Sequence, residues 1–165
     1  MVSATQPECD SERIQLLQGM SAFGGVDEEV VRYVLDRAKI IRVNREEYLY
    51  RQDDPGDSCF VVEKGQFALY RLYEGEDRHV RTFSRGDCFG EAAMIALTPR
   101  ICSAQALTDS SVIQISADLL HQIYDHDPKQ YIVMLLNIAR RICRTAQKDY
   151  DTLAKAKFDS DGPSD

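Results

Sequence analysis

Short β-favouring runs separated by turn signals fill the middle of the chain, from Ile40 to Ile115, and restrict the fold more than any other feature. The turn signals are Asp54-Pro55-Gly56-Asp57, Lys64-Gly65, Glu74-Gly75-Glu76, Arg85-Gly86-Asp87 and Thr108-Asp109-Ser110. Strands that recur about every ten residues are typical of an antiparallel sandwich or barrel. We therefore predict a barrel of about eight antiparallel strands over residues 38–116.

Helical patterns flank this region on both sides. Two clusters of apolar residues at helical spacing precede it, namely Ile14, Leu16, Leu17, Met20 and then Val30, Val31, Val34, Leu35, Ala38. Asp27 suits the N-cap of the second helix. After the barrel, Ser116 can cap a short helix through Ile123, and Pro128 can open a long helix to about Phe158. The predicted fold class is α+β: a jelly-roll-like antiparallel β-barrel with N-terminal helices and a long C-terminal helix.

Length and composition fit one compact domain. The chain has 165 residues, 44% of them hydrophobic, which is enough to bury a core of its own. We assign this domain to residues 10–158, with the C-terminal helices over 117–158. The ends, 1–9 and the acidic 159–165, are expected to be flexible. Membrane insertion is not expected, because no segment approaches the ~18 apolar residues that span a bilayer.

Charge and metal-ligating residues exclude several classes of function. The net charge of −7 argues against general binding to nucleic acid or anionic membrane. Five cysteines without Cys-x-x-Cys spacing suggest neither a disulfide framework nor a zinc site, and we expect reduced thiols in a cytoplasmic protein. Only His79 lies on a predicted strand, and no nucleophile elbow is present, so no metal, cofactor or catalytic residue is predicted.

One segment, residues 85–104, interrupts the β pattern with a short helix-favouring run, Glu91 to Ala96. The start of such a helix presents unpaired N–H groups and can seat an anion, and Gly90 allows close approach of the backbone. Arg100 follows, and its planar guanidinium suits bidentate contact with phosphate oxygens. Glu91 would repel the anion unless its carboxylate accepts hydrogen bonds from a hydroxyl. The combination predicts a ligand with a phosphate and a nearby sugar hydroxyl.

In this segment the chain resembles the cyclic nucleotide-binding domains of protein kinase regulatory subunits, gated channels and bacterial catabolite-activator-like regulators. Phe89-Gly90-Glu91-Ala92-Ala93 leads through a short helix to Pro99-Arg100-Ile101-Cys102-Ser103, as the family's phosphate-binding segment does, and Gly56 to Gly65 is similar to the strand and turn before it. The resemblance implies a barrel that binds cAMP or cGMP. It covers roughly residues 22–150.

The resemblance also implies roles for individual residues. Glu91 would bind the ribose 2′-hydroxyl, Arg100 the cyclic phosphate, and the N–H groups of Ala92 and Ala93 the same phosphate, with the Ser103 hydroxyl nearby. The candidate ligand-binding residues are Gly90, Glu91, Ala92, Ala93, Arg100, Ile101, Cys102 and Ser103.

Departures from the family pattern leave alternatives open. Ala92 stands where a larger aliphatic residue is usual, Met94 where Leu is common, and Ile101 and Cys102 where two small residues are common. A bulky Ile101 could narrow the pocket. The alternatives to a cyclic mononucleotide sensor are a ligand-free interaction or dimerisation module with the same fold, and a cyclic dinucleotide sensor.

The long C-terminal helix is the expected route of the signal. Its apolar residues Ile142, Ala146, Tyr150 and Leu153 are candidates to cover the base of a bound nucleotide. Closure of the helix would then couple ligand binding to an effector protein or to a second copy of the chain, in a homodimer through this helix. The basic cluster Arg140, Arg141, Arg144 and Lys148 is interpreted as a solvated face, and DNA binding is not expected.

Overall fold

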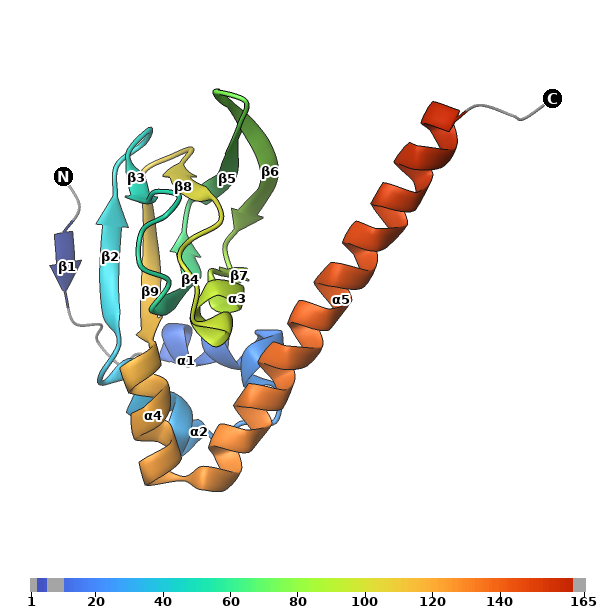
Figure 1. Cartoon of the computed structure of the whole chain (residues 1–165). Helices are drawn as coiled ribbons and strands as arrows, with labels where there is room; N and C mark the ends of the chain where they lie inside the picture. Colours follow the sequence, from blue (N-terminus) through green and yellow to red (C-terminus); the bar gives the residue numbers. More distant parts are fainter. Residues whose placement is uncertain (1–2, 6–10, 162–165) are drawn as a thin grey trace.

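Two antiparallel sheets face each other in the computed structural model, which describes residues 3–5 and 11–161, with side chains to residue 158 (Figure 1). The first sheet has the order β1 (Ser3–Thr5), β2 (Lys39–Val43), β9 (Ser110–Ser116), β4 (Ser58–Lys64), β7 (Cys88–Phe89). The second has the order β3 (Tyr48–Tyr50), β8 (Ser103–Ala106), β5 (Gln66–Tyr73), β6 (Glu76–Ser84). The predicted α+β class with an antiparallel barrel is confirmed.

The central strands β4 and β9 separate two apolar cores. Successive side chains of a strand point to opposite faces, so a strand covered on both sides is apolar throughout. Phe60 and Val62 belong to the core inside the barrel, whereas Cys59 and Val61 belong to the core shared with the helices. Inside the barrel, the ring of Phe89 lies 5.1–5.7 Å from three other phenylalanine rings, those of Phe60, Phe67 and Phe83.

Helices close the open end of the barrel beneath the strands (Figure 1). They are α1 (Ser11–Gln18), the 3-10 helix η1 (Ser21–Phe23), α2 (Glu28–Leu35), α4 (Ala117–His126) and α5 (Pro128–Asp161), while α3 (Glu91–Ala96) lies between strands β7 and β8. The Ser116 hydroxyl accepts a hydrogen bond from Leu119 N (3.1 Å), as its predicted cap role requires. Asp27 makes no side-chain cap in α2; its carboxylate instead accepts from Gln130 Nε2 (2.7 Å) and ties α2 to α5.

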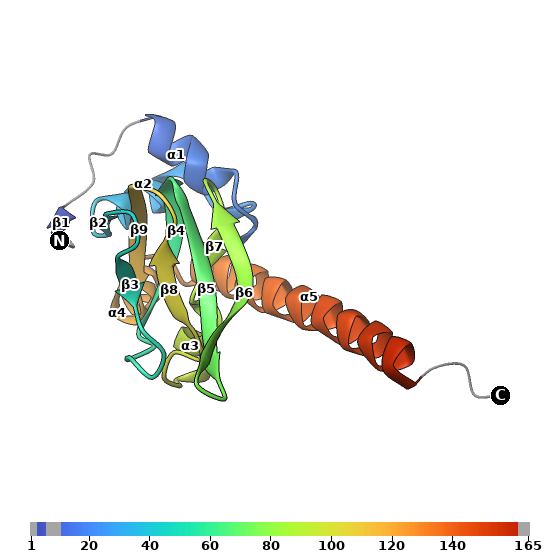
Figure 2. The same cartoon turned by 90° about the horizontal axis from the view of Figure 1, so that it is seen from above.

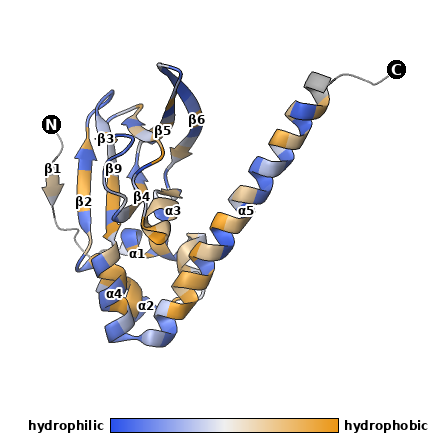
Figure 3. Ribbon diagram, viewed as in Figure 1, coloured by the Kyte–Doolittle hydropathy of each residue, from blue (hydrophilic) through white to orange (hydrophobic). Residues whose placement is uncertain are grey.

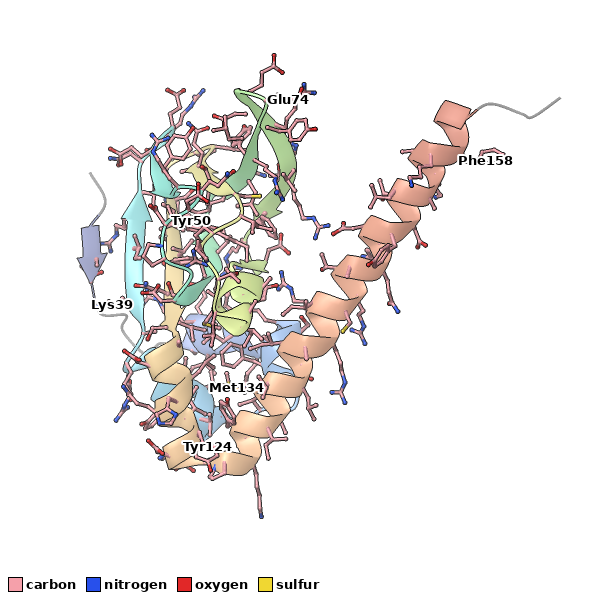
Figure 4. All side chains as sticks on the ribbon, viewed as in Figure 1. Lys39, Tyr50, Glu74, Tyr124, Met134 and Phe158 are labelled. Atoms are coloured by element: carbon pink, nitrogen blue, oxygen red, sulfur yellow. The ribbon has the colours of Figure 1, made fainter. Side chains whose placement is uncertain are left out.

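The first half of α5 is anchored, and the second half extends away from the barrel (Figures 1 and 2). Met134 and Ile138 are buried in the helix-side core. Tyr150, Leu153 and Phe158 are 60–79% exposed, and apolar and polar residues alternate along this part (Figure 3). Figure 4 shows Met134 among the helices beneath the barrel and Phe158 far from it. Within the described residues, no helix combines the length and apolar character needed to cross a membrane.

Both segments that were expected to be flexible contain residues with secondary structure. Ser3–Thr5 pairs with β2 as an edge strand, which brings the strand number to nine in the part of the chain described. At the other end, α5 continues to Asp161, so residues 159–161 extend the helix beyond the expected end at Phe158. The expectations for residues 1–2, 6–10 and 162–165 fall outside the described residues.

We predict that Met134→Ala destabilises the fold by about 2–4 kcal/mol, because it removes buried side-chain volume where α5 is anchored. Leu153→Ala on the exposed half of the same helix is the control, with an expected change below about 0.5 kcal/mol. Urea unfolding followed by circular dichroism measures both. Equal costs for the two substitutions would contradict the assignment of the anchor to the first half of α5.

Candidate functional site

A cavity of about 410 Å³ lies between the second sheet, the segment around α3, and α5. This volume is within the usual range for small-molecule sites. The sheet and β7 contribute Tyr50, Leu69, Val80, Arg81, Phe83 and Phe89, and α5 contributes Arg141, Ile142, Thr145, Ala146 and Asp149. All predicted site residues except Ser103 line the same cavity: Gly90, Glu91, Ala92, Ala93, Arg100, Ile101 and Cys102.

Arg100 is buried at the inner end of this site and lacks an anionic partner. Its residue is 3% exposed. Nη1 donates to the Gly90 carbonyl (3.0 Å) and Nη2 to the Ser58 hydroxyl (3.2 Å), while Nε is buried without a hydrogen-bond partner. Among the described residues, no carboxylate forms an ion pair with Arg100. A buried cation with neutral partners and an unused donor is suited to receive an anion.

Aromatic rings and backbone hydrogen bonds hold Arg100 in place. Its Cζ lies 4.4 Å from the ring centroid of Tyr50 and 5.3 Å from that of Phe60. Arg100 N donates to Asp54 O (2.9 Å) and its carbonyl accepts from Asp53 N (2.8 Å), so the predicted turn at residues 54–57 clamps the segment. Burial raises the pKa of Tyr50 well above its ordinary value, although the charge of Arg100 opposes this shift, and the phenol stays neutral.

Gly90 is required where the chain turns from β7 into α3. Its φ of +86° lies in the left-handed region that side chains rarely adopt. A Cβ at this position would lie 2.8 Å from Arg100 Nη1 and 3.3 Å from Ser58 O. The turn therefore brings the backbone close to the guanidinium, and the first N–H groups of α3 follow directly without a side-chain cap.

Glu91 pairs with the long helix. Its Oε1 lies 3.1 Å from Arg141 Nε, and the two side chains are only 12% and 22% exposed. Arg141 also donates to the Cys88 carbonyl, two residues before Gly90. The interpretation of Arg141 as part of a solvated face is thus wrong, because this residue alone of the basic cluster turns toward the barrel, whereas Arg140, Arg144 and Lys148 are exposed.

The remaining candidates occupy different positions around the cavity. Cys102 lies in the cavity wall and is 5% exposed. Burial raises the pKa of its thiol, and the nearby positive charge of Arg71 partly opposes this rise. Ile101 is 60% exposed and does not fill the cavity. Ser103 lies behind the wall in β8, where its hydroxyl accepts a hydrogen bond from Gln52 N (2.9 Å) and fastens the loop that clamps Arg100.

Only the first part of the expected lid borders the cavity. Ile142 and Ala146 line it, but Tyr150 and Leu153 do not and are largely exposed. The straight helix carries these later turns away from the strands (Figure 2). The four residues lie on one helix, as their spacing predicts, and the role of Tyr150 and Leu153 as a cover over a base stays a prediction.

A second hollow, of about 430 Å³ beside α1, is lined mostly by charged side chains. Two of the cations are paired: Arg13 with Glu63 (2.6 Å) and Arg85 with Glu12 (2.7 Å). Because Arg13 and Arg85 already have carboxylate partners and Arg42 and Lys64 are exposed, this hollow differs from the site of the buried Arg100. The part of the chain described contains no cluster of three or more potential metal ligands.

Comparison with known proteins places this site in a family. The family model described as "Cyclic nucleotide-binding domain" matches residues 40–127, which is more than half of the chain. The chain belongs to the cyclic nucleotide-binding domain family. The matched range contains most of β2, strands β3 to β9, the segment around α3 with Gly90, Glu91 and Arg100, and α4. The anchored part of α5, with Arg141, lies beyond the range that defines this cyclic nucleotide-binding domain.

Relatives of this cyclic nucleotide-binding domain are longer proteins. The chain is 30% identical over 109 residues to a cAMP-dependent protein kinase type II regulatory subunit of Drosophila melanogaster, covering 64% of this chain and 28% of that protein. It is 31% identical over 90 residues to the cGMP-dependent protein kinase egl-4 of Caenorhabditis briggsae, covering 53% of this chain and 12% of that one. The domain thus spans less than a third of the length of these relatives, among which are both regulatory subunits and larger enzymes.

Solved structures share the fold. A cyclic nucleotide-binding domain from Methylobacillus flagellatus superimposes with a TM-score of 0.77 at 22% identity, covering 88% of this chain and 82% of that one. The catabolite activator protein of Thermus thermophilus superimposes with a TM-score of 0.70 at 22% identity, covering 81% and 63% of the two chains. The jelly-roll-like barrel with flanking helices is therefore the fold of this cyclic nucleotide-binding domain.

Several cavity residues carry no local signal in the sequence. Arg81 and Val80 come from an ordinary strand, and Thr145 and Asp149 from a helix whose polar residues are numerous. They reach the cavity only because β6 and α5 converge on it in the folded chain. Helical spacing offered one clue, since Thr145, Ala146 and Asp149 follow Ile142 at intervals of three, four and seven residues and so share its face.

We predict that Gly90→Ala destabilises the domain more than Gly25→Ala does. Both positions have positive φ, +86° and +76°, so both substitutions incur backbone strain of about 1–2 kcal/mol. A Cβ at Gly25 meets no atom within 4 Å, whereas one at Gly90 displaces Arg100, at an added cost of about 1 kcal/mol or more. Chemical unfolding of the two variants measures the difference. A cost at Gly90 no larger than at Gly25 would show that the guanidinium is not held against this turn.

Proposed function

We propose that the domain binds a cyclic nucleotide monophosphate, cAMP or cGMP, in the cavity between the second sheet and α5. The observation that carries this proposal is the buried Arg100, whose Nε has no partner and whose charge has no counterion among the described residues. The cyclic phosphate is a monoanion at neutral pH and would supply both the missing acceptor and the missing charge.

The other predicted site residues have consistent roles in this proposal. Arg100 would bind the phosphate together with the N–H groups of Ala92 and Ala93, which helix geometry leaves without intrahelical acceptors. Glu91 would accept a hydrogen bond from the ribose 2′-hydroxyl while Arg141 holds its other side. Gly90, Ile101 and Cys102 would border the sugar and phosphate. Ser103 would act indirectly, through the loop it fastens.

The proposed output is a change in the position of α5. Arg141 joins α5 to the ligand-binding Glu91, so any change in the environment of Glu91 also changes the energy of the α5 contact. The exposed apolar residues of the distal half then favour transmission to an effector protein or to a second copy of the chain through this helix. We propose a regulatory and not an enzymatic role, and the cytoplasmic setting inferred from the cysteines stays a prediction.

A ligand-free interaction module is the second candidate. Two observations favour it: Glu91 already has a partner in Arg141, and Leu153 and Phe158 are exposed on α5. The same fold without a bound nucleotide would then serve only to present this helix. A cyclic dinucleotide as the ligand is the remaining alternative, and the ligand panel described next separates all three.

We predict that cAMP or cGMP at ~100 times its dissociation constant adds roughly 2.7 kcal/mol to the free energy of unfolding. Arg100→Ala should abolish this gain. It should leave the circular dichroism spectrum unchanged, because among the described residues no carboxylate would lose an ion-pair partner. Arg78→Ala, an exposed arginine of β6, is the control and should retain the gain. Thermal unfolding and calorimetric titration with cAMP, cGMP and cyclic di-GMP provide the measurements.

The outcomes distinguish the candidates. A response to cyclic di-GMP alone would support the dinucleotide alternative, and no response to any of the three would support the ligand-free module. Unchanged nucleotide affinity in Arg100→Ala would refute the role of this residue.

A separate prediction concerns Glu91. If its carboxylate binds the 2′-hydroxyl, removing that hydroxyl with 2′-deoxy-cAMP or 2′-deoxy-cGMP should weaken binding to the natural chain by about 1.5–3 kcal/mol. In Glu91→Gln the same change of ligand should cost much less, because the charged acceptor is already gone. The four affinities form a double-mutant cycle that isolates the interaction. A coupling energy near zero would mean that Glu91 serves only to hold Arg141.

A further inference from the structure

Three hollows adjoin one another on the outside of the barrel. The hollow of about 430 Å³ beside α1 shares Glu12, Leu16 and Arg85 with a second hollow of about 480 Å³. The second shares Gly19 and Gly86 with a third, of about 400 Å³, which α5 borders. Because neighbouring hollows have residues in common, they form one groove, which we call the basic groove, from the first sheet past α1 to α5.

Two unpaired cations lie at the sheet end of the basic groove. Arg42 of β2 and Lys64 of β4 both have Ser111 of β9 as their neighbour in the strand register. Adjacent strands are about 4.8 Å apart, so the Cα atoms of the two basic residues are about 10 Å apart. Both residues are exposed, and neither forms an ion pair with any residue that the structure describes.

Further cations lie at the helix end of the groove, on α5. Arg141, Arg144 and Lys148 line the third hollow and follow one another at intervals of three and four residues, so they share one face of the helix. Arg141 pairs with Glu91, whereas Arg144 and Lys148 are exposed and have no ion-pair partner among the described residues. Like charges at this spacing repel each other and destabilise a helix, so a negatively charged partner would stabilise this part of α5.

Between its two ends the basic groove is neutral and partly apolar. Arg13 pairs with Glu63, and Arg85 pairs with Glu12. Leu16 of α1 is half-buried and lines both the first and the second hollow. An occupant with negative charges at both ends and an apolar side chain in the middle therefore matches the groove.

The charges of the groove favour a peptide over a nucleic acid. The net charge of the chain is −7, so an excess of unpaired cations along one groove is a local feature. The carboxylates of Glu12, Glu63 and Asp87 also line the groove and would repel a continuous row of phosphates. A peptide backbone instead offers N–H groups that can donate to these carboxylates, and its acidic side chains can be spaced to match the cations.

We propose that the basic groove binds an acidic segment of a partner protein in an extended conformation. Carboxylates of this segment pair with the two unpaired cations at each end, and an apolar side chain between them packs on Leu16. The bound segment joins the barrel to α5. This docking site is separate from the proposed nucleotide site, because of its lining residues only Arg141 and Thr145 also border that cavity.

The test measures the binding of a fluorescein-labelled acidic peptide by fluorescence anisotropy, without nucleotide. A peptide of about nine residues, up to ~30 Å long when extended, carries a central leucine with aspartates and glutamates on both sides. Its affinity should fall as salt is added, because exposed charges are screened. Arg42→Gln/Lys64→Gln and Arg144→Gln/Lys148→Gln should each weaken binding about threefold to tenfold, since each loses two exposed ion pairs. Replacing the central leucine of the peptide by serine should also weaken binding several-fold.

The control variant is Lys129→Gln/Arg140→Gln, which removes the same charge from exposed positions of α5 outside the groove. It should change the affinity by less than about twofold. Thermal unfolding midpoints of all three variants should match that of the natural chain, because every substituted residue is exposed.

The outcomes separate this docking site from the proposed function. Equal weakening by the control, or no binding of the acidic peptide at low salt, would overturn the docking site while leaving the proposed nucleotide site intact. Unchanged affinity for the serine peptide would overturn the contact with Leu16. Tighter binding of a single-stranded RNA of equal charge would overturn the acidic peptide as the occupant.

Discussion

The buried guanidinium of Arg100 is the constraint on which the functional part of the structure depends. A cation removed from water is costly unless its surroundings compensate. Here the compensation comes from a carbonyl, a hydroxyl and aromatic faces, and no carboxylate of the described residues pairs with it. The left-handed turn at Gly90 and the clamp from Asp53 and Asp54 both serve to hold this group. The barrel thus holds a buried positive charge at the cavity with one hydrogen-bond donor, Nε, unused. An anionic ligand would supply the missing acceptor and the missing negative charge.

The long helix is connected to this site by polar contacts and not by a continuous apolar interface. Met134 and Ile138 fix its first turns in the helix-side core, and beyond them the ion pairs from α5 to the barrel, among the described residues, are those of Arg141 and Asp149. The Arg81–Asp149 pair is largely exposed and so individually weak, whereas the Glu91–Arg141 pair is mostly buried and is the contact through which the proposed ligand would act on the helix. The same contacts line the cavity and hold α5, so under the proposed function the coupling between ligand and helix would be reciprocal.

Much of the fold could be predicted from local patterns, because turn signals and caps act over a few residues. Ser116 and Pro128 begin their helices as expected, and the short insert at Glu91–Ala96 is present. The edge strand at Ser3–Thr5 could not be predicted, since three residues without apolar alternation carry no strand signal and pair only because β2 offers a free edge. The contact of Arg141 with Glu91 could not be predicted for a similar reason. In the sequence Arg141 does not differ from the other basic residues of its cluster, and only the packing of α5 against the barrel distinguishes it.

This contrast extends to the two ends of the cavity. The end near Arg100 draws most of its predicted site residues from one continuous segment, Gly90 to Cys102, so these residues could be identified from their spacing in the sequence. The opposite end is assembled from β6 and α5, which are 68 residues apart in the chain at the Arg81–Asp149 pair. The residues of this end come together only in the folded chain, so a movement of α5 would change this end of the cavity, whereas Gly90 and Arg100 are held by contacts within the barrel.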